Sequence, residues 1–135
     1  MKALVVDDRK ALQKGLRTGL LEAGFQILRA YEHQEAVDRL EDAGPVDLVL
    51  VNWKLNRGEG LKFVRFVRSL RGYDSLRLIM VTSELDTPTI LDAVRLGVDE
   101  FLIQPITRRK VLEKLVNLRF LKPGPARSSE RMVQQ

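Results

Sequence analysis

The stretch Val46–Asn56, with the sequence VDLVLVNWKLN, decides the fold. It begins as an apolar run on nearly consecutive positions and turns polar at Asn52. Such a run suits a parallel strand that is covered on both faces. Three further apolar runs also meet polar side chains at their ends, at Asp7-Asp8, at Thr82-Ser83 and at Gln104. We therefore predict a parallel sheet with a cluster of polar side chains at the carboxyl ends of its strands.

The rest of the chain alternates between short apolar runs and helical patterns. The predicted strands are Ala3–Val6, Gln26–Ala30, Val46–Val51, Leu76–Val81 and Glu100–Ile103. Apolar residues at helical spacing mark the predicted helices: Leu12, Leu16 and Leu20; Ala36, Val37 and Leu40; Leu61, Val64, Val67 and Leu70; and Val111, Leu115 and Leu118. A further helix is predicted to begin at Thr87-Pro88 and to end at Gly97, and Thr107 is predicted to begin the last one.

Strict alternation of strand and helix predicts an α/β domain with a parallel sheet. Right-handed crossovers leave few topologies for five strands. We expect the flavodoxin-like (βα)5 three-layer sandwich, with the parallel sheet in the order 2-1-3-4-5. In such sheets ligands lie beyond the carboxyl ends of the strands, where the polar residues are predicted to gather.

Length and composition limit the function. The 135 residues suit one domain, predicted at 1–121, followed by a disordered polar tail at 122–135 with the sequence KPGPARSSERMVQQ. The absence of cysteine excludes disulfides and thiol chemistry. No apolar run is long enough to span a membrane, so we expect a cytoplasmic protein. The net charge of +5 permits an anionic partner but identifies none.

Spacing along the chain resembles the receiver domain of bacterial response regulators. Asn52 follows Asp8 by 44 residues, and Phe101 and Gln104 follow Thr82 by 19 and 22 residues. These intervals fit the family's layout of acidic pair, phosphoacceptor, switch threonine, switch aromatic and lysine. Gly60 also stands where receivers commonly carry glycine. The resemblance covers about residues 2–121 and implies two-component phosphorelay signalling.

Carried over by position, the resemblance implies a metal site. Asp7 and Asp8 would be the acidic pair that binds Mg²⁺, and the backbone carbonyl of Lys54 would be another ligand. Asn52 stands at the phosphoacceptor position. Adjacent aspartates after a strand also have a simpler reading as helix N-caps.

The resemblance also implies switch positions. Thr82 would supply the hydroxyl that follows the phosphoryl group, and Phe101 would be the rotating aromatic. Phe101 lacks the hydroxyl of a tyrosine, and we expect it to lie inward as part of the core. Gln104 stands at the lysine position, and its bond to Pro105 would be cis.

Two departures change the expected chemistry. The Asn52 amide carries no negative charge and cannot form an acyl phosphate. Gln104 removes the cation that would pair with the phosphoryl group. Because one negative and one positive charge are lost together, we interpret the chain as a co-adapted pseudo-receiver that is not phosphorylated, with weakened or lost Mg²⁺ binding and no enzymatic activity. The alternative is an ordinary phosphoacceptor receiver in an inactivated, Asp-to-Asn form.

We expect partners to be signalling proteins, such as a histidine kinase or a downstream target. A basic rim of Arg9 and Lys10 in the first turn of the first helix, and of Arg108, Arg109 and Lys110 in the first turn of the fifth, is the predicted contact surface. Scattered solvated charge is the alternative reading. The face formed by the fourth helix, fifth strand and fifth helix is the predicted homodimer surface, and nucleic-acid binding is not expected because no basic aromatic stripe occurs. His33 is expected to be a surface residue, and Trp53 a packing residue near the site.

Overall fold

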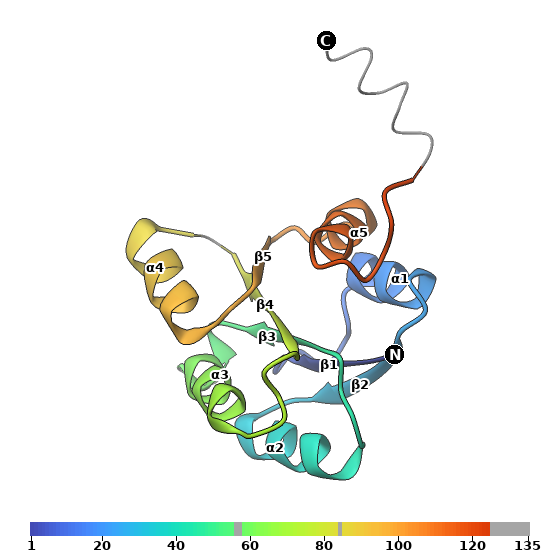
Figure 1. Cartoon of the computed structure of the whole chain (residues 1–135). Coiled ribbons are helices and arrows are strands. Elements are labelled where there is room, and N and C mark those ends of the chain that lie inside the picture. Colours follow the sequence, from blue (N-terminus) through green and yellow to red (C-terminus); the bar gives the residue numbers. More distant parts are fainter. Residues whose placement is uncertain (56–57, 84, 125–135) are drawn as a thin grey trace.

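The chain forms a parallel sheet with helices on both of its faces (Figure 1). The computed structural model describes residues 1–55, 58–83 and 85–124. The strands are β1 (Lys2–Val6), β2 (Gln26–Ala30), β3 (Leu48–Asn52), β4 (Arg77–Thr82) and β5 (Glu100–Ile103). The helices are α1 (Lys14–Glu22), α2 (His33–Asp42), α3 (Glu59–Ser69), α4 (Thr87–Leu96) and α5 (Arg108–Asn117). The strand order is β2-β1-β3-β4-β5, which confirms the predicted flavodoxin-like topology.

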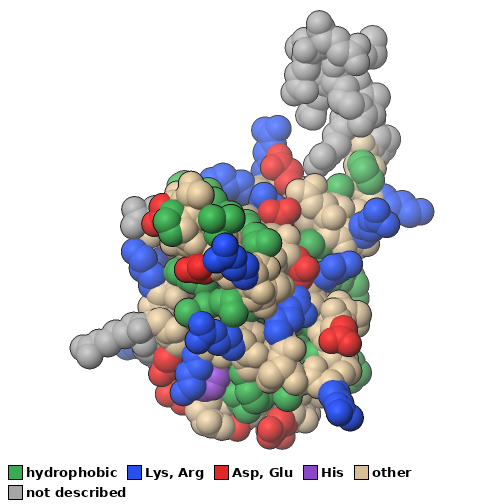
Figure 2. Space-filling model, turned by 60° about the vertical axis from the view of Figure 1, so that its left-hand side comes forward, with side chains coloured by type: hydrophobic (Ala, Val, Ile, Leu, Met, Phe, Trp, Pro, Cys, Tyr) green, Lys and Arg blue, Asp and Glu red, His purple; other side chains and the backbone are tan. Residues whose placement is uncertain are grey.

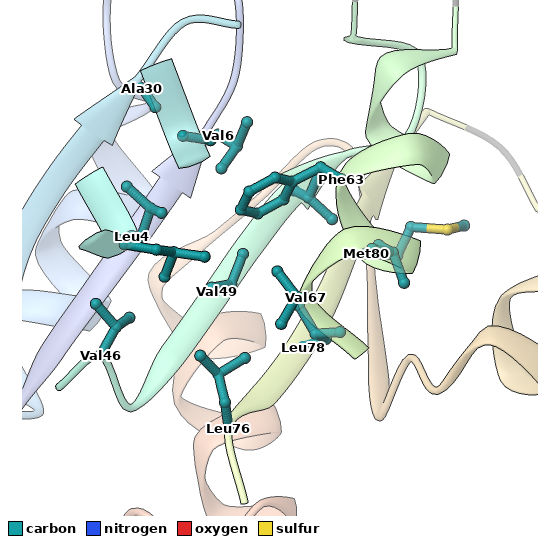
Figure 3. Packing of buried hydrophobic residues seen from close by; sticks show 14 of the residues in the cluster. Leu4, Val6, Ala30, Val46, Val49, Phe63, Val67, Leu76, Leu78 and Met80 are labelled. Atoms are coloured by element: carbon teal, nitrogen blue, oxygen red, sulfur yellow. The ribbon is translucent and has the colours of Figure 1, made fainter. Parts of the chain in front are cut away.

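Two apolar clusters hold the three layers together. Alternate residues of the central strands point to opposite faces of the sheet. On one face, Leu4, Val49 and Leu78 pack with Phe63 and Val67 of α3, as Figure 3 shows. The other face is covered by α1 and α5. Because β1, β3 and β4 are buried on both faces, their sequences are apolar at nearly every position, which is the pattern that predicted the parallel sheet.

The glycine pattern of α1 brings it close to α5. A Cβ on Gly15 would lie 2.5 Å from the carbonyl oxygen of Ile106, and one on Gly19 would lie 2.7 Å from Val111. Both distances are too short for a real side chain. These two glycines therefore permit the close contact of the two helices that cover this face of the sheet.

The start of α1 differs from the prediction. The helix begins at Lys14, so Arg9 and Lys10 lie in the loop after β1 and not in a first helical turn. The carboxylate of Asp7 accepts a hydrogen bond from the backbone N–H of Arg9 at 3.0 Å, which turns the chain directly after the strand. Leu12 still packs against the core from this loop, and this packing explains why it fitted the helical spacing.

The other predicted ends agree with the structure to within a few residues. The strand predicted at Val46–Val51 is observed at Leu48–Asn52, and β5 has the predicted bounds. Thr107 caps α5, since its hydroxyl accepts a hydrogen bond from the Lys110 backbone N–H at 3.2 Å. None of the described helices is long and apolar enough to cross a membrane. The tail predicted at 122–135 lies mostly outside the described residues, so the predicted domain boundary stays a prediction.

Candidate functional site

The four polar positions singled out from the sequence meet at one edge of the sheet. Asp7 follows β1 directly, Asn52 ends β3, Thr82 ends β4 and Gln104 follows β5. These strands are neighbours in the sheet, so their carboxyl ends lie side by side. The backbone N–H of Gln104 donates to the carbonyl of Thr82 at 2.9 Å, and this hydrogen bond holds Gln104 beside the end of β4.

The Asn52 side chain is held at both ends. Its Nδ2 donates to Oδ1 of Asp7 at 3.4 Å, and its Oδ1 accepts from the backbone N–H of Lys54 at 3.1 Å. Asp7 is 9% exposed, and the same Oδ1 also accepts from Arg9 N. The amide therefore presents a hydrogen-bond donor to the buried carboxylate and uses its oxygen within its own loop.

Gly60 and Trp53 set the backbone around Asn52. A Cβ on Gly60 would lie 2.4 Å from the Asn52 carbonyl oxygen and 2.9 Å from that of Trp53. Only glycine allows the first turn of α3 to approach the strand end so closely. Trp53 N donates to the Val81 carbonyl at 3.0 Å, and its half-buried side chain packs against the core as predicted.

The candidate magnesium ligands Asp7 and Asn52 are engaged with each other and with backbone N–H groups. Mg²⁺ requires oxygen ligands in near-octahedral geometry. The Asp7 carboxylate already accepts hydrogen bonds from the Arg9 backbone N–H and from the Asn52 side chain. Asn52 therefore turns its NH₂ group, and not its oxygen, toward that carboxylate. Asp8 is exposed. Within the described ranges no group of three or more His, Cys, Asp or Glu side chains is arranged to hold a metal ion.

The switch positions are partly or fully buried. Thr82 is only 3% exposed. Phe101 is half-buried: it packs against the core cluster and also lines a hollow beside Ile103 and Lys110, so its inward position as a core residue stays a prediction. The Gln104–Pro105 peptide bond is cis, as the resemblance implied.

Part of the predicted basic rim is neutralised within the domain. Arg108 forms an ion pair with Glu22 of α1, and this hydrogen-bonded contact lowers the pKa of the Glu22 carboxyl. Arg109 pairs with Glu113 at 3.3 Å. Lys110 donates to the backbone carbonyls of Ile103, the last residue of β5, and of Pro105. Arg9 and Lys10 are exposed and form no ion pair among the described residues.

His33 is less exposed than the sequence suggested. Its imidazole lies edge-on to the rings of Phe63 and Phe66, at centroid distances of 5.9 and 6.0 Å. Nδ1 is buried and accepts or donates no hydrogen bond within the described ranges. Burial, followed by the nearby charge of Lys62, lowers the pKa of this imidazole. Nothing in the local sequence marks this packing, because the two aromatic residues lie in α3.

Comparison with known proteins settles the family. The model of the response regulator receiver domain matches residues 3–116. The chain is a response regulator receiver domain. A chemotaxis protein CheY homolog of Campylobacter jejuni is 31% identical to it over 116 residues, which cover 85% of this chain and 89% of the relative. CheY1 of Helicobacter pylori is 28% identical over 116 residues, with coverage of 85% and 94%.

Solved structures agree with this fold. The chemotaxis response regulator CheY4 of Vibrio cholerae has a TM-score of 0.77 at 22% identity, covering 87% of this receiver and 97% of that chain. A CheY-like receiver domain protein of Methanospirillum hungatei has a TM-score of 0.74 at 25% identity, with coverage of 87% and 93%. Receiver domains are regulatory parts of two-component signalling and interact with kinases and downstream targets. This receiver therefore belongs to that class of signalling protein.

Proposed function

We propose that this receiver works without aspartyl phosphorylation, as a non-enzymatic protein-interaction module in two-component signalling. The observation that carries the proposal is the Asn52 side chain, whose NH₂ faces the Asp7 carboxylate while its oxygen accepts from Lys54 N. A phosphoacceptor has to present an anionic oxygen to the phosphorus atom. A neutral amide with its oxygen engaged and its donor turned into the site lacks that nucleophile.

The residue at position 104 supports the same proposal. Phosphoryl transfer depends on cations that neutralise the charge on the transferred group. Gln104 is neutral, so the site has neither the nucleophile nor this cation. The donated hydrogen bond from Asn52 also gives Asp7 a partner that requires no metal. We propose that Mg²⁺ binds this receiver weakly or not at all and is not needed for its function.

The alternative is an ordinary receiver inactivated by one substitution at Asn52. The two proposals differ in what restores phosphorylation. If Asn52 is the only defect, the single variant Asn52→Asp regains transfer from acetyl phosphate. If positions 52 and 104 are co-adapted, Asn52→Asp alone accumulates negative charge beside Asp7 without a compensating cation, and the double variant Asn52→Asp with Gln104→Lys is required.

Intact mass after incubation with acetyl phosphate and Mg²⁺ tests this proposal. We expect no phosphoryl group on the unaltered chain and one on the double variant. Asn52→Ala with Gln104→Lys is the matched control, because it restores the cation without a nucleophile at position 52. Full modification of the single Asn52→Asp variant would favour the alternative.

The face formed by α4, β5 and α5 is our proposed surface for a homodimer or a target protein. Figure 2 shows hydrophobic side chains among charged ones on the side of the molecule that carries α4. Val94 is 55% exposed, and Leu91 and Ile103 are also exposed. A hollow of about 390 Å³ lies between β5 and α5, lined by Phe101, Ile103 and Lys110 among others. Val94→Asp should weaken any self-association seen by sedimentation, and an unchanged dimer would exclude this face.

A further inference from the structure

The cations of α5 differ in their ion pairing from those around α1 and β2. On α5, Arg108, Arg109 and Lys114 all pair with carboxylates. On the α1 side, Lys14 and Arg17 form no ion pair within the part of the chain that the structure describes, and both are exposed. Arg9, which is exposed, and Arg29, which is half-buried, also form no ion pair among the described residues. The positive charge around α1 and β2 is therefore not neutralised by carboxylates of the described residues, unlike that of Arg108, Arg109 and Lys114.

A groove of about 430 Å³ lies among these cations. It is lined by Leu12, Arg17 and Leu21 from the α1 side and by Gln26, Ile27 and Arg29 from β2. Three of the lining residues are aliphatic, two are arginines and none is acidic. Leu21 is 50% exposed, so part of the aliphatic surface is open to solvent. The groove therefore combines an apolar floor with positive charge.

The arginine of β2 is held in place before any partner arrives. Nη2 of Arg29 donates to the Arg9 carbonyl at 2.9 Å, and its guanidinium lies 4.9 Å from the centroid of the Tyr31 ring. Its Nε is buried and has no hydrogen-bond partner among the residues that the structure describes. Fixing a long side chain in advance lowers the entropy lost on binding. Arg29 can therefore recognise a carboxylate at lower cost than a freely moving surface arginine.

The helix contributes an ordered row of side chains. Lys14, Arg17 and Leu21 stand at positions i, i+3 and i+7 of α1, and such residues share one helix face. Among the described strands β2 pairs only with β1, so its outer edge offers backbone hydrogen-bonding groups beside the groove. An extended peptide lying along such an edge can use both backbone groups and side-chain pockets.

We propose that the α1–β2 groove, lined by Leu12, Arg17, Leu21, Gln26, Ile27 and Arg29, binds an acidic segment of a partner protein that also carries aliphatic side chains. Carboxylates of the segment face Lys14, Arg17 and Arg29, and its aliphatic side chains cover Leu21 and Ile27. The proposal rests on the role as a protein-interaction module but not on the loss of phosphorylation.

Two other occupants fit the groove less well. A nucleic acid satisfies the cations through phosphates but leaves the aliphatic floor without an apolar partner. The acidic face of α2 in a second copy of this chain offers the exposed carboxylates of Asp38, Glu41 and Asp42, but the exposed residues of that helix are polar and provide no aliphatic anchor. An acidic and aliphatic peptide matches both properties of the groove.

Fluorescence anisotropy with a labelled peptide tests the proposal. The probe is a short fluorescein-labelled peptide in which glutamates alternate with leucines, and polyglutamate of the same length and a short DNA duplex are comparators. We expect the glutamate–leucine peptide to bind most tightly. Lys14→Glu with Arg17→Glu should raise its Kd by about tenfold or more, because two attractive contacts become repulsive. The matched control, Arg39→Glu with Arg65→Glu, changes the net charge equally on the opposite face of the sheet and should change Kd by less than about twofold.

Leu21→Ser separates the apolar contribution from the charge. This side chain is half exposed, so its replacement leaves the core intact. We expect weaker binding of the glutamate–leucine peptide and unchanged binding of polyglutamate. Three outcomes would each overturn the proposal. The first is an equal effect of the two charge reversals on Kd, and the second is tighter binding of DNA than of the peptide. The third is self-association, measured by sedimentation, that is lost in the Lys14→Glu, Arg17→Glu variant. None of these outcomes depends on the acetyl phosphate experiment, so the two proposals fail separately.

Discussion

The Asn52→Asp variant should unfold more easily than the unaltered receiver when no divalent cation is present. The substitution replaces an N–H donor 3.4 Å from Oδ1 of Asp7 with a negatively charged oxygen. At that distance two unit charges repel by about 1 kcal/mol in bulk water and by about 5 kcal/mol at an effective dielectric constant of about 20. Because Asp7 is mostly buried, the loss should lie between these limits, reduced by rotation of the new side chain.

Magnesium should reverse this loss. The variant supplies a third carboxylate beside Asp7 and Asp8, which is a donor set that Mg²⁺ accepts. A ligand that binds only the folded state at about a hundred times its Kd stabilises that state by about 2.7 kcal/mol. The unaltered receiver should show almost no dependence of its unfolding free energy on Mg²⁺.

Urea denaturation in EDTA and in millimolar Mg²⁺ measures both effects. Asn52→Ala is the matched control, since it removes the hydrogen bond to Asp7 without adding charge. We expect Asn52→Ala to lose about 1 kcal/mol in either buffer. The reasoning would be refuted if Asn52→Asp in EDTA were as stable as Asn52→Ala, or if Mg²⁺ stabilised the unaltered chain as much as the variant.

Three further predictions concern the scaffold. Arg68→Ala should lower the free energy of unfolding, measured by urea denaturation, by about 2–4 kcal/mol. The Arg68 guanidinium donates to the carbonyls of Tyr73, Leu76 and Gly97, and its removal leaves these carbonyls without that donor. A loss below about 0.5 kcal/mol would contradict this prediction. Gly60→Ala should destabilise by about 1–3 kcal/mol, because its Cβ would meet the Asn52 carbonyl at 2.4 Å, and unchanged stability would show that α3 can shift. Stability should fall as pH drops below about 6.5, because the imidazole of the unfolded chain then binds a proton more readily than the partly buried imidazole of folded His33, whose pKa is lowered. His33→Gln should flatten that slope between about pH 5 and 7, and an equal slope in the variant would exclude His33 as its source, since it is the chain's one histidine.

Most of the fold could be predicted because local and global signals agree. Runs such as Leu48–Val51 are apolar at every position, as a strand covered on both faces requires. Thr107 and Gly97 mark helix ends through hydrogen bonding and backbone conformation that are local to the sequence. The start of α1 was predicted wrongly, because Leu12 packs into the core from a loop and so imitates the helical spacing.

The site was predictable in position but not in arrangement. Spacing placed Asp7, Asn52, Thr82 and Gln104 at one edge of the sheet, and the structure places their backbones there. The direction of the Asn52 amide depends on the carboxylate of Asp7, 45 residues away in the sequence. Sequence patterns do not encode such contacts between distant segments.

The rim of cations shows the same limit. Arg108 is neutralised by Glu22, a residue 86 positions earlier, because the small glycines of α1 bring α5 close. Charge counting along the sequence treated Arg108 as available to a partner. Arg17 and Arg29, which the sequence did not single out, are the arginines that line a groove without a carboxylate.

Phosphoryl transfer to the unaltered receiver tests the central claim most directly. The receiver is incubated with Mg²⁺ and either acetyl phosphate or a phosphorylated histidine kinase, and its intact mass is measured beside that of Asn52→Ala. The account predicts no phosphoryl group on either protein. A phosphoryl group on the unaltered chain, lost in Asn52→Ala or mapped to another carboxylate of the site, would contradict it.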